Sequence, residues 1–427
     1  MITTEKNNNL FKKKFLWGAS TASHQVEGRT INQWSVWELE NAHRLASKAY
    51  PKLKKLSNWE DIEKHVHNPS NYVSGEGVDH YNRFKEDFKL LEGLNFNSFR
   101  FGIEWSRIEP AKGQWNQDEI NHYHEYIDEL IKRDIKPIMN IWHWTMPVWF
   151  TDEGGFTKAK NLKYFEEFVK KITDEYGSKL EYIITLNEPN VYASCSYLTG
   201  VWPPQDKNLV KFVKVFYNLS RAHKKAYRII KKANPSIKVG IANQVANIQA
   251  KRPHNLFDEL STKWMRYFWN WWFYERIRNY QDFIGMNYYF TDYYTGKVQK
   301  RNPEIPLSDT GWYMEPEGLY PIILRAWTRF KKPIIITENG VADSKDEYRQ
   351  WWIDESILAM ERALSEGVEL DGYMHWSLLD NFEWDSGWWP KFGLIEVDRA
   401  NDMKRTVRPS ATYFAKRIKD LQLKRTD

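Results

Sequence analysis

Cysteine is nearly absent from this chain of 427 residues, which contains only Cys195. A single cysteine excludes an internal disulfide and any zinc or iron–sulfur centre built on several thiolates. The chain also lacks a run of about 18 apolar residues, and the apolar run near its basic N-terminus is too short for a secretory signal. These absences favour a cytoplasmic protein without a membrane partner.

Signals for nucleotide and metal binding are missing as well. No G-x-G-x-x-G follows the first apolar segment, and no Walker A sequence occurs. His65 and His67 alternate without an obvious third ligand, so we expect them on the surface rather than at a metal. The net charge of +6 is small for this length and argues only weakly for binding to nucleic acid. We therefore expect no cofactor, no metal and no nucleic-acid partner.

Aromatic residues, by contrast, are abundant: 22 Trp, 24 Tyr and 22 Phe make up 16% of the chain. Most such side chains fill cores, and the remainder can form flat binding faces. Hydrophobic residues (42%) and charged residues (28%) occur in the proportions of a globular protein with a large core. Wholesale disorder is therefore excluded.

Eight short apolar segments rich in β-branched residues alternate with longer amphipathic segments, which predicts repeated βα units. The predicted strands are 15–21, 96–105, 136–144, 182–189, 238–244, 282–289, 333–340 and 372–380. Helical periods are clearest over 118–133, 160–176 and 209–233. Eight strands predict a closed (β/α)8 TIM barrel of the α/β class with elaborated βα loops. No linker divides the chain, so we expect one catalytic domain over 1–427; an open, doubly wound sheet is the alternative.

Polar or aromatic residues end most of these segments, and a barrel would gather them around one mouth. Two glutamates follow apolar strands directly, Glu188 in TLNEP and Glu338 in ITENG. Two such carboxylates can cleave a glycosidic bond, one protonating the leaving oxygen while the other attacks the anomeric carbon or activates water. Each motif alone is weak, because a strand-end glutamate can equally pair with an arginine such as Arg100.

The combination of motifs is far more specific. In order along the chain they are FLWGASTASHQVEG, FRFGIEWSRIEP, TLNEP, DFIGMNYY, PEGLY, ITENG and WSLLDNFEWDSGWWPKFGL. From about 15 to 410 the sequence resembles glycoside hydrolase family 1, the β-glucosidase and β-galactosidase family. The resemblance implies a retaining β-glycosidase that releases terminal non-reducing β-D-glucosyl or galactosyl residues, with fucosyl as a further candidate, through a covalent glycosyl-enzyme. Its partner would be a small-molecule β-glycoside or an oligosaccharide.

The resemblance also assigns catalytic roles. Glu188 matches the general acid/base of the family and Glu338 its nucleophile. Arg100 and Tyr289 match neighbours that orient and charge-stabilise the nucleophile, and Asn287 matches a residue near the acid/base. The two glutamates have the same intrinsic pKa, so their different roles must come from their surroundings.

Further residues match those that bind the sugar. A sugar has polar edges and apolar faces, so its site needs forked hydrogen-bonding groups and an indole face. The predicted sugar-binding residues are Gln25, His143, Trp144, Asn187, Trp376, Glu383, Trp384 and Phe392. Among them Trp376 would be the platform beneath the sugar ring, and Trp202 is a further candidate for an apolar face.

Two regions depart from the family pattern. The excursion, the segment between the predicted strands 238–244 and 282–289, is shorter than is usual in the family. Its residues 255–281 are predicted to form one aromatic-rich helix. The insertion 42–74 is longer than usual and resembles the archaeal-like branch of the family; it would lie at the entrance or at a subunit contact. The aglycone subsites and the oligomeric state therefore stay open, as does the choice between glucose and galactose.

Three alternatives remain. A 6-phospho-β-glycosidase would replace Glu383 and Trp384, and it would carry a tyrosine where this chain has Phe392. A transglycosidase would share every catalytic residue and differ only in the acceptor. A non-catalytic sugar-binding barrel would be expected to lose one of the two glutamates, and this chain keeps both.

Overall fold

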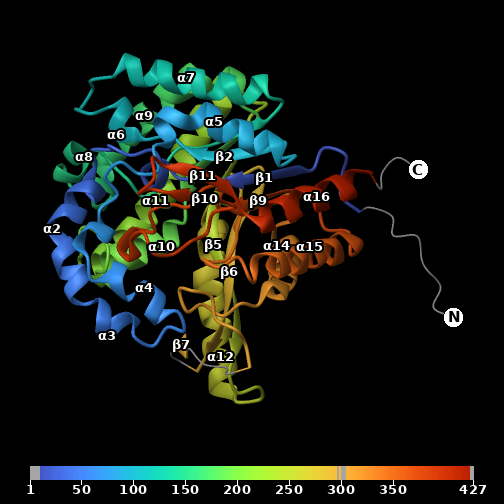
Figure 1. Cartoon of the computed structure of the whole chain (residues 1–427). Helices are drawn as coiled ribbons and strands as arrows, with labels where there is room; N and C mark the ends of the chain where they lie inside the picture. The colour runs from blue at the N-terminus through green and yellow to red at the C-terminus, as the bar shows by residue number, and fades with distance from the viewer. Residues whose placement is uncertain (1–9, 296–297, 300–303, 424–427) are drawn as a thin grey trace.

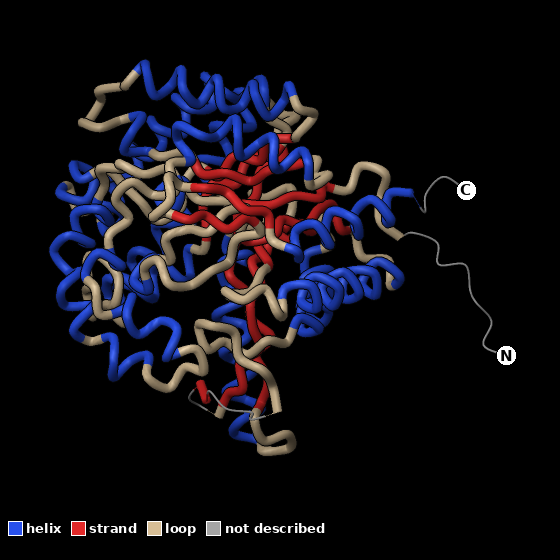
Figure 2. Tube along the Cα trace, viewed as in Figure 1, coloured by secondary structure: helices blue, strands red, loops and turns tan. Residues whose placement is uncertain are grey.

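The computed structural model describes residues 10–295, 298–299 and 304–423. Eight parallel strands form a closed barrel surrounded by helices (Figures 1 and 2). The barrel strands are β1 (Leu16–Ser20), β2 (Ser98–Gly102), β3 (Lys136–Asn140), β4 (Tyr182–Asn187), β5 (Lys238–Ala250), β6 (Ile284–Tyr294), β8 (Ile334–Asn339) and β9 (Leu370–Trp376). Their order is β5-β4-β3-β2-β1-β9-β8-β6, and the pairing of β5 with β6 closes the barrel. The predicted TIM barrel is thus confirmed, and the open sheet is excluded.

Each predicted strand overlaps an observed one, but β5 and β6 run well past their predicted ends at 244 and 289. The two strands stay paired as far as Ala250 and Tyr294, with a register shift between Val245 and Asn247. A short strand, β7 (Val298–Gln299), pairs antiparallel with the end of β6. A two-strand ribbon therefore extends beyond the barrel mouth, toward the lower edge of Figure 1.

The barrel interior is a packed core at its N-terminal end. Its cluster comprises Leu16, Ile138, Tyr182, Ile184, Ala242, Phe283, Ile335 and Met374. Close packing also explains Gly18 in β1, since a Cβ there would lie 2.3 Å from the carbonyl oxygen of Ser98 in β2. Filling this end of the barrel leaves the carboxyl ends of the strands available for a site.

Amphipathic helices cover the outside of the barrel. The α-helices are α1 (Ser23–Val26), α2 (Gln33–Ser47), α3 (Ala49–Leu53), α4 (Trp59–Val66), α5 (His80–Gly93), α6 (Trp105–Ile108), α7 (Gln117–Lys132), α8 (Val148–Asp152), α9 (Leu162–Tyr176), α10 (Pro189–Ala193), α11 (Leu209–Ala233), α12 (Leu256–Arg266), α13 (Trp272–Arg276), α14 (Leu319–Phe330), α15 (Arg349–Ser365) and α16 (Pro409–Leu423). The side chain of Asn116 caps α7, and that of Asn208 caps α11. The three helical periods taken from the sequence coincide with α7, α9 and α11. Within the described residues, no helix is long and apolar enough to cross a membrane.

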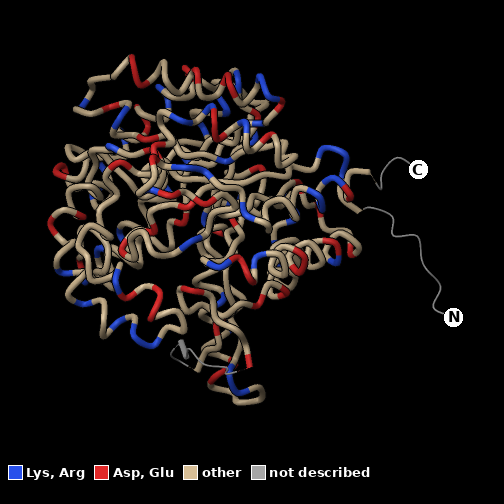
Figure 3. Tube along the Cα trace, in the orientation of Figure 1, with Lys and Arg blue, Asp and Glu red and all other residues tan. Residues whose placement is uncertain are grey.

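The two unusual regions differ in how they pack. The insertion 42–74 lies against the loop that follows β9, where Lys52 pairs with Asp385 at 3.0 Å and Trp389 joins the cluster of Ala49 and Ile62. The short excursion forms α12, a π-helical turn (Tyr267–Trp271) and α13 in succession. The π-turn is an interruption that the sequence did not predict. Charges of both signs are spread over the chain (Figure 3).

Candidate active site

Glu188 and Glu338 line one cavity of about 300 Å³ at the carboxyl ends of the strands. Glu188 follows β4 directly, and its backbone has a left-handed φ of 40°. Such a conformation is uncommon for a residue with a side chain and is often found at functional sites. Glu338 is the second-last residue of β8, and both side chains are buried. The predicted pair of strand-end carboxylates therefore meets in one site.

Glu338 is held by two hydrogen-bond donors. The Nη1 group of Arg100 donates to its Oε1, forming a buried ion pair. The hydroxyl of Tyr289 donates to Oε2 at 2.5 Å. These two donors hold the carboxylate of Glu338 in a fixed orientation in the cavity wall.

Glu188 has different surroundings. Its Oε1 accepts a hydrogen bond from Asn287 at 2.8 Å, and no cation is bonded to it among the described residues. Burial, followed by the negative charge of Glu338, raises the pKa of Glu188 well above its ordinary value. Glu188 is therefore suited to keep its proton at neutral pH and to act as a general acid.

Asn187 connects the two glutamates to the adjacent wall. Its Oδ1 accepts hydrogen bonds from Arg100 at 2.7 Å and Asn287 at 3.1 Å. Its Nδ2 lies 2.8 Å from Nε2 of His143, and its carbonyl accepts from the indole of Trp144 at 2.9 Å. Burial and the charge of Arg100 lower the pKa of His143, which keeps the ring neutral. These bonds fix the orientation of every side chain in the group.

Glu383 is a third acidic group in the cavity. Nε2 of Gln25 donates to Oε2 of Glu383 at 3.4 Å, and Asn381 donates to the same oxygen at 3.1 Å. Burial raises the pKa of Glu383 to about 8. Much of this carboxyl is therefore protonated at neutral pH and can donate as well as accept a hydrogen bond. The Oε1 atom of Gln25 is buried without a partner among the described residues, so an acceptor remains beside the cavity.

Aromatic rings form the apolar walls. Trp376, Tyr289 and Phe392 belong to one buried cluster, in which the rings of Tyr289 and Phe392 are 6.3 Å apart. On the other side, the rings of Trp144 and Trp384 are 4.8 Å apart. The cavity thus offers flat apolar faces beside forked polar groups, as a sugar requires.

Nine of the thirteen predicted site residues line this cavity. They are His143, Trp144, Glu188, Tyr289, Glu338, Trp376, Glu383, Trp384 and Phe392. The other four, Gln25, Arg100, Asn187 and Asn287, stand behind them and bond to lining residues. The predicted set therefore forms one connected group.

Trp202, the further candidate for an apolar face, also lines the cavity. The remaining lining residues were not predicted as site residues, and they are Val191, Cys195, Gln244, Trp269, Phe290 and Trp312. Burial raises the pKa of the Cys195 thiol, consistent with the expected unreactive side chain. Trp269 comes from the π-turn of the short excursion, and its indole donates to Oε1 of Gln244 in β5. The only signal in the sequence that could have indicated Trp269 as a cavity-lining residue was the high aromatic content of this segment.

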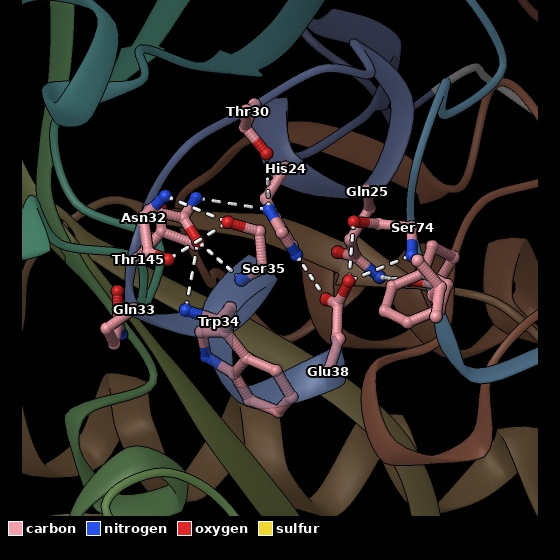
Figure 4. Close-up of polar contacts among 12 residues, drawn as sticks. His24, Gln25, Thr30, Asn32, Gln33, Trp34, Ser35, Glu38, Ser74 and Thr145 are labelled. Atoms are coloured by element: carbon pink, nitrogen blue, oxygen red, sulfur yellow. Dashed lines mark hydrogen bonds and ion pairs between the residues drawn. The ribbon is translucent and has the colours of Figure 1, made fainter. Parts of the chain in front are cut away.

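A buried polar network lies behind Trp384. Figure 4 shows its contacts around His24 and Glu38. The ring of His24 stacks on that of Trp384 at 5.6 Å, and its Nε2 is hydrogen-bonded to Oε1 of Glu38 at 2.7 Å. Oε2 of Glu38 accepts from both the backbone nitrogen and the hydroxyl of Ser74, and Nδ1 of His24 lies 2.8 Å from the Thr30 hydroxyl. The network connects α2 to the cavity wall at Trp384, and the sequence did not predict it. Within the part of the chain that the structure describes, no group of three or more His, Cys, Asp or Glu side chains is placed to hold a metal ion.

Comparison with known proteins agrees with this geometry. A family model of glycosyl hydrolase family 1 matches residues 7–279 and 274–422. The chain is 30% identical to beta-glucosidase A of Thermotoga maritima over 97% of this chain and 99% of the relative. It is 29% identical to a chloroplastic galactolipid galactosyltransferase of Arabidopsis thaliana, over 97% of this chain and 74% of the relative.

A solved structure gives the same result. The beta-glucosidase from Thermotoga maritima in complex with glucoimidazole superposes with a TM-score of 0.81, at 28% identity, covering 96% of this chain and 99% of that chain. Fold and sequence agree along nearly the whole length. The chain therefore belongs to glycosyl hydrolase family 1 and is an O-glycosyl hydrolase.

Proposed function

We propose that this protein is a retaining β-glycosidase that hydrolyses terminal non-reducing β-D-glucosyl or β-D-galactosyl residues of small-molecule glycosides, with fucosyl residues as a further substrate. The observation that carries the proposal is the contrast between two glutamates in one cavity. Glu338 is bonded to Arg100 and Tyr289, whereas burial and the charge of Glu338 keep Glu188 protonated. A carboxylate nucleophile beside a carboxylic acid is the arrangement that double displacement needs.

In the first step, the carboxylate of Glu338 attacks the anomeric carbon as the bond to the leaving oxygen breaks. Glu188 transfers its proton to that oxygen, so the aglycone leaves as a neutral alcohol. In the second step, the ionised Glu188 takes a proton from water, and the resulting hydroxide attacks the same carbon from the opposite face. Glu338 is released as a carboxylate, and Glu188 is protonated again.

The sugar would be held by the polar side of the cavity. In this proposal Gln25, His143, Asn187, Glu383 and Trp384 bind its hydroxyls, and Trp376 with Phe392 supports its apolar face. Trp144 fixes Asn187 through the hydrogen bond to its carbonyl. The protonated fraction of Glu383 would donate to a sugar hydroxyl, which an ordinary carboxylate cannot do.

The remainder of the cavity favours an apolar aglycone. Its lining there consists of Val191, Trp202, Trp269, Phe290 and Trp312. The one nearby amide oxygen, Oε1 of Gln244, is already occupied by the indole of Trp269. An aryl or alkyl aglycone would bury its surface against these side chains without leaving polar groups unpaired.

A transglycosidase is the second candidate, because one relative is named a galactolipid galactosyltransferase. The same covalent intermediate would be attacked by a sugar hydroxyl in place of water. The apolar lining would then shelter the intermediate and bind an acceptor. We regard the whole of 1–427 as one catalytic domain in either case, and the cytoplasm remains its predicted location.

Hydrolysis of nitrophenyl glycosides tests the proposal. The panel contains β-glucoside, β-galactoside, β-fucoside, β-mannoside and 6-phospho-β-glucoside, and NMR follows the anomer formed first. Initial release of the β-anomer from the β-glucoside or β-galactoside is expected. Initial release of the α-anomer would contradict the retaining mechanism, and a sugar-transfer product dominating over free sugar would favour the transglycosidase.

A further inference from the structure

A second large hollow lies on the outer wall, between α12 with its π-turn and α14. This groove has a volume of about 820 Å³, and its lining includes Leu260, Trp264, Tyr267, Arg266 and Arg325. It shares no lining residue with the catalytic cavity. The groove lies where the short excursion crosses the barrel wall.

The crest of the groove is an exposed apolar stripe along α12. Leu256 is 74% exposed, Phe257 66%, Leu260 58% and Trp264 63%, and Tyr267 continues the stripe into the π-turn. The spacing of these residues places most of them on one side of a helix. In Figure 1, α12 lies at the lower edge of the molecule beside the extended ribbon of β5 and β6. Large apolar side chains gathered on a projecting helix indicate a surface that binds something.

Two arginines in the groove lack acidic partners among the described residues. Nη1 of Arg325 is buried without a hydrogen bond, and burial lowers the pKa of this guanidinium. Burial and the charge of Arg325 also lower the pKa of Arg266, whose Nε donates to the carbonyl of Ile248. Glu259 is the one acidic residue that acts on Arg266, and it does so weakly from an exposed position. The groove thus holds two adjacent cations and invites an anion.

The charge of the protein is concentrated in the segments that flank this groove. Segments 251–276 and 319–332 together contain nine lysines and arginines but only three acidic residues, so their net charge is +6. The whole chain also carries +6, so the remaining residues sum to zero. Within the groove itself the charge is of one sign, since its lining includes Lys263, Arg266, Arg325 and Arg329 and no acidic residue among those the structure describes. The exposed apolar side chains of α12 therefore lie beside a cationic groove.

We propose that this face docks on a membrane surface that contains anionic lipids. The apolar side chains of α12 enter the interface, while Arg266 and Arg325 bind a lipid phosphate in the groove. Interfacial helices combine a Trp, Phe and Leu face with Lys and Arg in this way, and they need no spanning segment. The proposal departs from the sequence-based expectation of no membrane partner, which rested on the absence of a spanning run.

A second copy of the chain fits this face less well. Most homodimers are twofold symmetric, so the same patch would meet itself. Such a contact would place two segments of net charge +6 against each other, and like charges across an interface are unfavourable. Nucleic acid would match the charge but not the exposed Leu and Phe side chains.

Co-sedimentation of the full chain with vesicles tests the proposal. Wild-type protein should sediment with vesicles of phosphatidylcholine mixed with phosphatidylglycerol and not with pure phosphatidylcholine, and added salt should weaken binding. The double variant Leu260→Ser, Trp264→Ser should bind at least about tenfold more weakly, because it loses two of the inserted side chains. Arg325→Gln should bind about fivefold more weakly.

The matched control carries Trp351→Ser and Leu358→Ser on α15, which are also exposed, and it should bind as the wild type does. Circular dichroism and glycosidase activity establish that each variant is folded. The proposal is overturned if wild-type protein ignores the anionic vesicles, or if the α12 variant binds them unchanged. Dimerisation that the α12 variant abolishes would assign the face to a second copy instead. If duplex DNA displaced the protein from vesicles, and the Leu260→Ser, Trp264→Ser variant bound that DNA as tightly as the wild type does, the face would be assigned to nucleic acid.

Discussion

Two arginines, the buried Arg100 and the half-buried Arg325, show how the barrel mouth differs from the outer wall. At the mouth, both Nη groups of Arg100 donate, one to Glu338 and the other to Asn187. On the wall, Nη1 of Arg325 is equally hidden yet bonds to nothing among the described residues. At the mouth, other side chains of the same chain neutralise and orient the charged groups, and catalysis depends on charged groups that are oriented in advance. On the outer wall, Arg325 has no acidic partner among the described residues, so it can bind an external anion.

Removing Glu338 should produce the largest effect. Glu338→Ala removes the nucleophile and should lower kcat by more than about 10⁴-fold. Because the cavity left behind faces the α side of a β-glycoside, azide should react there with an activated substrate and give the α-glycosyl azide. Formation of the β-glycosyl azide would reverse the assignment of the two glutamates. Leu260→Ser on the outer wall is the control and should keep wild-type kcat.

Glu188→Ala should have a smaller effect that depends on the leaving group. Substrates whose aglycone needs a proton should lose roughly 10²–10⁴-fold in kcat, whereas a dinitrophenyl glycoside should still form the covalent intermediate. Azide then attacks from the β face, so mass and NMR analysis should identify the β-glycosyl azide. Equal losses for good and poor leaving groups would exclude Glu188 as the acid.

The pH profile should follow the raised pKa of Glu188. This pKa lies above that of an ordinary glutamate, so the acid form persists into the neutral range, and activity falls as pH rises through it. The observed limb belongs to the coupled pair of glutamates rather than to one residue. Measuring kcat/KM against pH for Glu188→Gln, on an activated substrate, should show that the basic limb has disappeared. A basic limb retained in that variant would contradict the assignment.

The strands that position these glutamates could be predicted from sequence because a parallel barrel buries both faces of each strand. Such strands are nearly continuous apolar runs, as in 334–336, where three isoleucines precede Thr337 and Glu338. The ribbon formed by the ends of β5 and β6 could not be predicted in the same way. Its polar and aromatic residues pair across a register shift at Val245 and Asn247, which depends on the neighbouring strand.

The site shows the same division. Glu188 and Glu338 could be placed at one mouth because the barrel topology gathers strand ends. Gln25, Glu383, Trp384 and Phe392 lie outside the barrel strands and were identified from the resemblance to the family. Trp269 and Trp312 come from excursions, and their positions depend on how those segments pack on the barrel. His24 and Glu38 were missed for a related reason, since a buried hydrogen bond between two side chains leaves no periodic signal in the sequence.

The network of Glu38 tests whether the mouth depends on supports behind it. Glu38→Gln replaces one carboxylate oxygen with an NH₂ group, which donates hydrogen bonds and does not accept them. The oxygen replaced is either Oε2, which accepts two hydrogen bonds from Ser74, or Oε1, which is bonded to His24. Loss of these buried bonds should lower the free energy of unfolding by roughly 1–3 kcal/mol. Because His24 stacks on Trp384, KM should also rise while kcat changes less. Denaturant unfolding and steady-state kinetics measure both effects. Glu40→Gln, on the exposed face of the same helix, should change neither, and an equal loss there would attribute the effect to charge alone.

The smallest effect should have the opposite sign. Arg325→Leu removes a buried donor that has no partner among the described residues, and leucine suits both the helix and the apolar lining of the groove. In buffer without lipid, the variant should therefore be more stable by about 1 kcal/mol, since the cost of burying an unpaired group is removed. The matched control is Arg329→Leu, one turn along α14, where the guanidinium is bonded to Glu275 at 2.5 Å. That change should be neutral or slightly destabilising in thermal unfolding. If Arg325→Leu instead lowered Tm, Arg325 would be stabilised by interactions within the chain, as Arg100 is at the mouth. The contrast between the two regions would then be wrong.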